Sequence, residues 1–225
     1  MLPLLMPAGE SGRPVSVLVV GAHPDDIEIG AGGLLLALGP SRPRVRYVLF
    51  TGSEDRRAEA KAAASAFLPE AELTMTLHDL PEGRLPALWG TVKDLLEAEA
   101  RSFAPDVVIA PNSDDAHQDH RTIAEIIRTV FRDALYLGYE IPKWDGDLGR
   151  PTMYVPMTDE TARRKVELLN NSYPSQRGRD WWSDDVFLGL ARLRGMECRA
   201  PYAEAFHCGK AIILPAAPPV GAVGR

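Results

Sequence analysis

VSVLVVGAHPDD, residues 15–26, is the stretch on which the fold of this chain depends. Its first seven residues are mostly valine and other apolar or small residues, which is typical of a strand buried on both faces of a parallel sheet. Gly21 then lets the backbone turn sharply and Pro24 stiffens the turn. Ligands of open α/β sheets bind beyond the carboxyl ends of the strands. The stretch therefore predicts a central strand with a functional site directly after it.

Strand-like and helical stretches continue to alternate up to about residue 132. Further strands are expected at residues 45–50, 73–78 and 106–110, and helices at residues 27–38, 57–67, 88–101 and 122–132. The last of these helices carries its isoleucines and a valine on one face, as a helix packed on a sheet does. Four alternations predict an α/β fold, with a Rossmann-like, mainly parallel sheet flanked by helices.

The pattern changes after about Tyr136, where proline, glycine and tryptophan become frequent. Helices are expected at residues 159–170 and 184–194, and we interpret this part as a C-terminal cap region with substrate-facing loops, not as a second domain. The expected organisation is a loose N-terminal leader at residues 1–14, a single domain at residues 15–214 and a disordered tail at residues 215–225.

The composition is that of an ordinary globular protein. With 225 residues, 45% of them hydrophobic, one domain can bury a full core. The net charge of −6 and the lack of a long basic block argue against a nucleic-acid partner. No apolar run reaches the roughly 18 residues of a membrane span, so no membrane association is expected. Cys198 and Cys208 lack metal-type spacing and are expected to be reduced thiols of a cytoplasmic protein, with a disulfide as the alternative.

The first candidate cluster is the turn after the first strand. His23 and Asp26 stand three residues apart across it, so an imidazole and a carboxylate can meet at one metal ion. The side chains of the adjacent Asp25 and Asp26 should point in different directions, which leaves one carboxylate free as a general base. The alternative is that both aspartates only cap the helix that begins near Ile27.

The second candidate cluster, His117-Gln118-Asp119-His120, follows the strand expected at residues 106–110. One imidazole can bind a metal while the other faces the substrate, and Asp119 can hold an imidazole in the required tautomer. The alternative is a pair of surface histidines at a helix start. Together the clusters supply two histidines and one carboxylate, which is typical of a catalytic zinc site with open positions. An iron oxygenase uses the same ligand types, but it needs neither Asp25 nor an α/β scaffold.

Both clusters match sequence motifs of a known family. Ala22-His23-Pro24-Asp25-Asp26 and residues 117–120 resemble the LmbE-like, or PIG-L, family of N-acetylglucosamine deacetylases. Weaker matches, spread between about residues 15 and 206, are TG at 51–52, RRAEA at 56–60, SQ at 175–176 and YAEAF at 202–206. One departure is Ile27, which stands where an acidic residue often follows the aspartate pair directly.

The resemblance implies a Rossmann-like enzyme that removes the N-acetyl group from an N-acetylated sugar or sugar conjugate, a small molecule whose identity it leaves open. It implies one zinc ion, with iron(II) as the alternative metal. The implied ligands are His23, Asp26 and His120. Asp25 would be the general base, His117 would stabilise charge or act as an acid, and Arg56 would bind the substrate. Members of the family are often oligomers, so a homo-oligomer stays open.

The residues themselves suggest a further role for His117. A cationic imidazole held by Asp119 could stabilise an oxyanion or protonate a leaving nitrogen, and its loss of a proton would give a basic limb in the pH profile. The tryptophans of the second half can stack on a sugar or pack in the core; they are Trp144, Trp181 and Trp182. His207 receives no role. A non-catalytic metal- or sugar-binding protein remains the third alternative.

Overall fold

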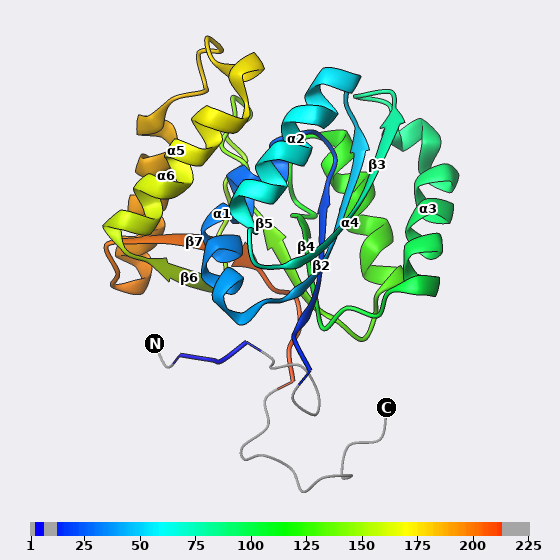
Figure 1. Ribbon diagram of the computed structural model, residues 1–225, viewed down its shortest axis with the longest axis horizontal. Coiled ribbons are helices and arrows are strands. Elements are labelled where there is room, and N and C mark those ends of the chain that lie inside the picture. Colours follow the sequence, from blue (N-terminus) through cyan, green and yellow to red (C-terminus); the bar gives the residue numbers. More distant parts are fainter. Residues whose placement is uncertain (1–2, 7–12, 213–225) are drawn as a thin grey trace, which may run out of the picture.

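The computed structural model describes residues 3–6 and 13–212, and its layers are shown in Figure 1. The predicted tail at residues 215–225 and much of the predicted leader at residues 1–14 lie outside the described residues. The boundaries expected for the single domain therefore stay predictions.

Seven strands form one sheet in the order β3-β2-β1-β4-β5-β7-β6. The strands are β1 (Ser16–Gly21), β2 (Arg44–Thr51), β3 (Glu72–Leu80), β4 (Val107–Pro111), β5 (Leu135–Tyr139), β6 (Met153–Met157) and β7 (Tyr202–His207). The first five strands pair in parallel, whereas β7 pairs antiparallel with both β5 and β6. The predicted α/β fold with a mainly parallel sheet is confirmed.

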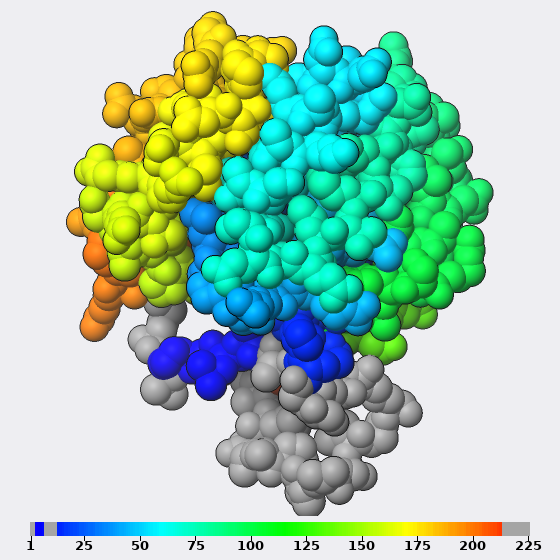
Figure 2. All heavy atoms as spheres, viewed as in Figure 1, coloured from blue at the N-terminus to red at the C-terminus, as the bar shows by residue number. Residues whose placement is uncertain are grey.

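Helices cover both faces of the sheet. They are α1 (Asp26–Leu38), α2 (Glu54–Phe67), α3 (Trp89–Ser102), α4 (Gln118–Val130), α5 (Asp159–Ser172) and α6 (Asp184–Cys198), with short 3-10 turns at η2 (Gly39–Ser41), η3 (Leu85–Leu88) and η4 (Pro174–Gln176). Helix α3 packs with α4, and α1 packs with α2 and α5. Figure 2 shows α2 and α5 side by side on one surface, in cyan and yellow. Within the described ranges, no helix is long and apolar enough to cross a bilayer.

Strand β1 is apolar throughout because helices lie on both of its faces. Val17 and Val19 pack into the cluster under α1, α2 and α5, whereas Leu18 and Val20 pack into the cluster under α3 and α4. All four side chains are fully buried. Because successive side chains of a strand point to opposite faces, only an unbroken apolar run can fill both layers.

The expected cap after Tyr136 is an incomplete description of the C-terminal half. Its helices α5 and α6 are present, but three strands from this half also extend the same sheet. Strand β7 pairs antiparallel with both β5 and β6, and β6, which contains Pro156, forms the edge of the sheet. Proline is tolerated at an edge strand, where one row of N–H groups has no ladder partner, yet it weakens the strand pattern in the sequence.

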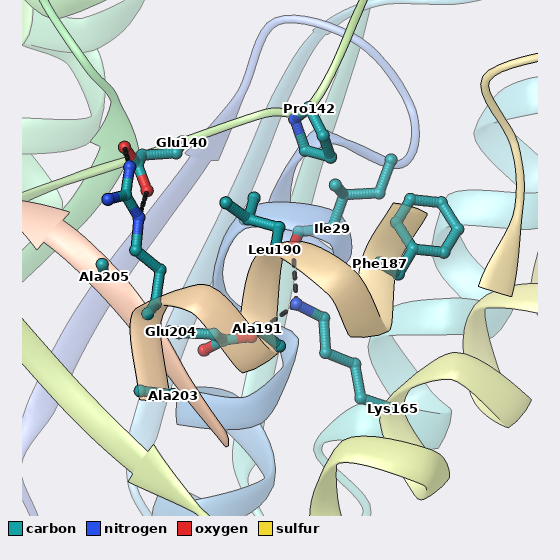
Figure 3. Close-up of a pocket in the computed structure, with 12 residues that line it drawn as sticks. Ile29, Glu140, Pro142, Lys165, Phe187, Leu190, Ala191, Ala203, Glu204 and Ala205 are labelled. Atoms are coloured by element: carbon teal, nitrogen blue, oxygen red, sulfur yellow. Dashed lines mark hydrogen bonds and ion pairs between the residues drawn. The ribbon is translucent and has the colours of Figure 1, made fainter. Parts of the chain in front are cut away.

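A buried charge network joins β7 to α1 and α5, as Figure 3 shows. The Glu204 carboxylate accepts the backbone N–H groups of Gly33 and Leu34 at 2.6 and 2.7 Å. The Lys165 ammonium donates to Glu204 at 2.7 Å and to the Ile29 carbonyl at 2.6 Å. Every polar partner is thereby satisfied away from water, so the network fixes where α1 packs on the sheet.

We expect Glu204→Ala to lower the free energy of unfolding by about 3–5 kcal/mol, because it leaves the Lys165 ammonium buried without its carboxylate. Denaturant titration followed by circular dichroism measures this loss. Glu167→Ala, which removes a carboxylate whose side chain is 58% exposed beside Arg164, is the matched control and should cost less than about 1 kcal/mol. Equal costs for the two variants would contradict the prediction.

Candidate active site

The two predicted clusters meet at one edge of the sheet. Strands β1 and β4 are parallel neighbours, and β1 pairs with β2 on its other side, so the direction of winding reverses between β1 and β4. Such a switch point is where open α/β sheets form a ligand site. In Figure 1 the arrows of β1, β2 and β3 all point to this edge, which is uppermost in the view.

Three polar atoms face one another at the centre of the site. The Nδ1 atom of His23 lies 3.2 Å from Nε2 of His120 and 3.3 Å from Oδ2 of Asp26. The same Asp26 oxygen lies 3.1 Å from Nε2 of His120. The ring of His117 is next to them, with its centroid 4.6 Å from that of His23. The three histidines are grouped closely enough to hold a metal ion.

Two of the histidines have a carboxylate on their second nitrogen. Nε2 of His23 is 3.2 Å from Oδ2 of Asp119, and Nδ1 of His120 is 2.9 Å from Oδ2 of Asp115. His117 is held differently, because its Nδ1 accepts the backbone N–H of Asp119 at 3.2 Å. A carboxylate behind the imidazole is the usual arrangement for metal-binding histidines, where it fixes the ring and its tautomer.

The predicted pairing of Asp119 with His117 is wrong. The buried Asp119 carboxylate contacts His23 and also accepts the backbone N–H groups of Gly83 and Leu85 at 2.6 and 3.0 Å. Burial and the neighbouring His23 and His120 lower the pKa of His117, which favours the neutral ring. A lowered pKa disfavours the cationic form that was expected for His117, and the basic limb assigned to this residue stays a prediction.

The aspartates give the centre of the site a negative potential. Burial lowers the pKa of His23, but the Asp26 and Asp119 carboxylates outweigh it and raise that pKa to about 10. Burial also lowers the pKa of His120, but the Asp26 and Asp115 carboxylates outweigh this effect and raise that pKa to about 9. An environment that favours positive charge on two buried imidazoles also favours a bound divalent cation.

The capping alternative for the aspartate pair is wrong. Asp25 stands at the N-cap of α1 without a side-chain hydrogen bond to the helix, and Asp26 accepts the N–H groups of Ala22 and His23 instead. Asp25 has a φ of 101°, in the left-handed region that residues other than glycine rarely adopt. Strained backbone of this kind concentrates at functional sites, where the surrounding structure holds it in place.

Asp25 is buried against an arginine. Its Oδ2 accepts a hydrogen bond from the Arg56 guanidinium at 2.9 Å, and the same guanidinium also donates to the Pro24 carbonyl. Burial raises the pKa of Asp25, the charge of Asp26 raises it further, and Arg56 opposes the rise. The sequence did not predict this contact. It places Arg56 where the guanidinium can position Asp25. The predicted contact of Arg56 with the substrate stays a prediction.

Sequence reasoning missed two residues behind the histidines. Asp115 accepts the backbone N–H of His117 at 2.7 Å besides its contact with His120, and Lys143 lies 3.0 Å from the Asp115 carboxylate. An acid two residues before His117 was a visible signal for the first. Lys143 gave no signal, because it follows β5 and reaches the site only through the fold.

The aromatic and histidine residues left without a role fall into two groups. Trp182 is buried, with its indole N–H donated to Asn170 at 3.0 Å, and His207 lies 3.5 Å from Glu140. Trp144 and Trp181 instead line a groove near the active site. Core packing therefore accounts for Trp182, whereas stacking on a ligand stays open for the other two tryptophans.

Solved structures share this fold. The chain is similar to a conserved protein of Thermus thermophilus, with a TM-score of 0.74 and 20% identity over 91% of this chain and 100% of that one. It is similar to the N,N'-diacetylchitobiose deacetylase of Pyrococcus horikoshii, with a TM-score of 0.66 and 22% identity over 86% of this chain and 83% of that one. It is also similar to the 4-carboxy-2-hydroxymuconate hydratase of Pseudomonas putida, with a TM-score of 0.71 and 16% identity over 91% of this chain and 100% of that one.

A family model matches residues 18–131, just over half of the chain. The matched range begins inside β1 and ends directly after α4, so it contains both halves of the site, including His23 and His120. The resemblance found in the sequence motifs is thereby confirmed. This chain belongs to the PIG-L family, whose model is described as GlcNAc-PI de-N-acetylase.

Proposed function

We propose that this chain is a metal-dependent hydrolase that removes the N-acetyl group from an N-acetylated sugar or sugar conjugate. One observation carries the proposal. Two imidazole nitrogens and one Asp26 oxygen lie within 3.3 Å of one another, and the buried carboxylate of Asp25, bound to none of them, lies beside Asp26 in the chain. Metal ligands with an adjacent carboxylate that is not itself a ligand are what hydrolysis by an activated water requires.

The residues fit one divalent ion. Ligand atoms at 2.0–2.1 Å from a tetrahedral zinc lie about 3.3 Å apart, and the three distances here are 3.1, 3.2 and 3.3 Å. We assign the ion to His23, Asp26 and His120, because both of these histidines have a carboxylate on the second nitrogen and His117 has none. Zinc is the proposed metal, with iron(II) as the alternative.

The bound metal would supply a Lewis acid that polarises the acetyl carbonyl and makes a water molecule more acidic. Asp25 accepts a proton from that water as the water oxygen bonds to the acetyl carbon. Nδ1 of His117 accepts the backbone N–H of Asp119, so the proton of the neutral His117 ring is on Nε2. The Nε2–H of His117 then stabilises the charge on the carbonyl oxygen. Asp25 then returns its proton to the nitrogen as the carbon–nitrogen bond breaks, releasing acetate and the amine.

Family membership and the deacetylase among the similar structures support this reaction. The hydratase of similar fold is a reason to test it, because a fold does not define a reaction. The substrate is proposed to be a small molecule of the cytoplasm, the expected location of this chain.

Amine release from a panel of N-acetylated glycosides and nucleotide sugars, with elemental analysis of the purified protein, tests the proposal. We expect a bound divalent metal, amine release, and loss of that release on chelation. A metal-loaded protein that releases no amine from any member of the panel would overturn the assignment, and an oxygen requirement would point to an oxygenase.

Arg56→Ala should lower kcat by about 10–100-fold with less effect on KM, because Asp25 loses the guanidinium that positions it. Arg57→Ala is the matched control, since the Arg57 guanidinium donates to the Gly52 carbonyl and touches no proposed catalytic residue. Steady-state kinetics separates the two roles of Arg56. A rise in KM alone would return this residue to substrate binding.

A further inference from the structure

A groove lined by one exposed indole, that of Trp144, and one partly buried indole, that of Trp181, lies at the same edge of the sheet as the active site. The segment at residues 142–148, which follows β5, and the segment at residues 180–186, which leads into α6, line it. Its volume is about 310 Å³. The rings of Trp144 and Trp181 pack edge to face, with centroids 6.3 Å apart at 78°, and Trp144 is 68% exposed.

One ion pair and one hydrogen bond attach this groove to the loop that precedes α4. Lys143, in the groove lining, lies 3.0 Å from the Asp115 carboxylate that holds His120. The Asp147 carboxylate accepts the backbone N–H of Ala116 at 2.6 Å. Lys143 and Asp147 thus make the segment that lines the groove a direct neighbour of the loop that precedes α4.

The chemistry of the lining selects among the groups that could extend there. The indoles offer apolar faces, and the Asp180 carboxylate offers an acceptor for hydroxyl groups. Lys143, the basic residue of the lining, is already shared between Asp115 and Asp147, at 3.0 and 2.5 Å. A phosphate or carboxylate in the groove would thus meet a negative charge without an uncommitted cation among the lining residues.

We propose that the groove lined by Trp144 and Trp181 binds a second, uncharged sugar ring of the substrate. A pyranose has an apolar C–H face, which an indole can cover, and a rim of hydroxyl groups, which Asp180 can bind. The inference rests on the proposed deacetylase function and narrows its substrate class to neutral oligosaccharides or glycosides, as opposed to sugars on a phosphate-bearing carrier.

The first experiment compares three substrates: N,N'-diacetylchitobiose, N-acetylglucosamine and N-acetylglucosamine 1-phosphate. We expect kcat/KM to be at least about tenfold higher for the disaccharide than for either monosaccharide. Trp144→Ala should remove about tenfold of that advantage through KM and leave N-acetylglucosamine unchanged. Met196→Ala, which truncates a side chain that is 66% exposed on α6 outside the groove, is the matched control and should change none of the three values.

The second experiment measures tryptophan fluorescence as chitobiose, which has no acetyl group, is added to the wild type and to Trp144→Ala. We expect a saturable change in the wild type that the variant loses. If no substrate is deacetylated but this change occurs, the reaction assignment fails and the sugar site stands. Faster turnover of the phosphorylated sugar, an equal effect of Trp144→Ala on all substrates, or no Trp144-dependent fluorescence change would each overturn the groove assignment.

Discussion

Asp25→Asn is expected to lower kcat by about 10²–10⁴-fold while the protein keeps its metal, because an amide cannot accept the proton of the attacking water. Asparagine has nearly the same shape and tolerates the left-handed region better than most residues, so the φ of 101° at this position should persist. The contact with the Arg56 guanidinium can also persist through the amide oxygen. The loss should therefore report proton transfer and not a rearranged turn.

Amine release from the best substrate of the panel and elemental analysis of the same preparation measure this effect. Asp114→Asn is the control, since Asp114 is an exposed acid in the loop that also carries His117. Its kcat should stay within about twofold of the wild type. If Asp25→Asn protein were purified without metal, Asp25 would be a ligand, and the proposed division of labour between Asp25 and Asp26 would be wrong.

His120→Ala is expected to abolish tight metal binding, and with it activity. Nε2 of this residue lies 3.1 Å from the Asp26 carboxylate and 3.2 Å from Nδ1 of His23, so its loss removes one corner of the proposed ligand triangle. The affinity should fall by more than the roughly 10–100-fold typical of losing an outer partner such as Asp115. His23→Ala and Asp26→Ala should behave in the same way.

His117→Ala is the comparison that separates the two ligand sets available to this site, since three histidines are also close enough to hold an ion. We expect this variant to retain the metal and to lose kcat, because its Nε2–H is proposed to stabilise the carbonyl oxygen. Competition with a chromogenic chelator gives the metal affinity of each variant. A loss of metal from His117→Ala as large as that from His120→Ala would favour three-histidine coordination.

The fold could be predicted from the sequence because its signals are local. Strand β1 is an unbroken apolar run, and helix and strand alternate through α4, so the periodicity of hydrophobic residues indicates a buried parallel sheet. The carboxyl ends of parallel strands share one edge, so His23 and His120 could be placed near each other although 97 positions separate them. The antiparallel pair of β7 and β6 lacked such a pattern, and the edge strand β6 with Pro156 lacked it most.

The order of residues along the chain thus determined the class of the fold, the edge of the sheet that carries the site and the chemical groups gathered there. Tertiary structure alone decided which group contacts which. The Asp119 carboxylate contacts His23 and not the nearby His117, and Lys143, which follows β5 in the chain, contacts Asp115. The physical reason is that the direction of a side chain depends on backbone angles and on partners brought in from distant segments, such as the N–H groups of Gly83 and Leu85.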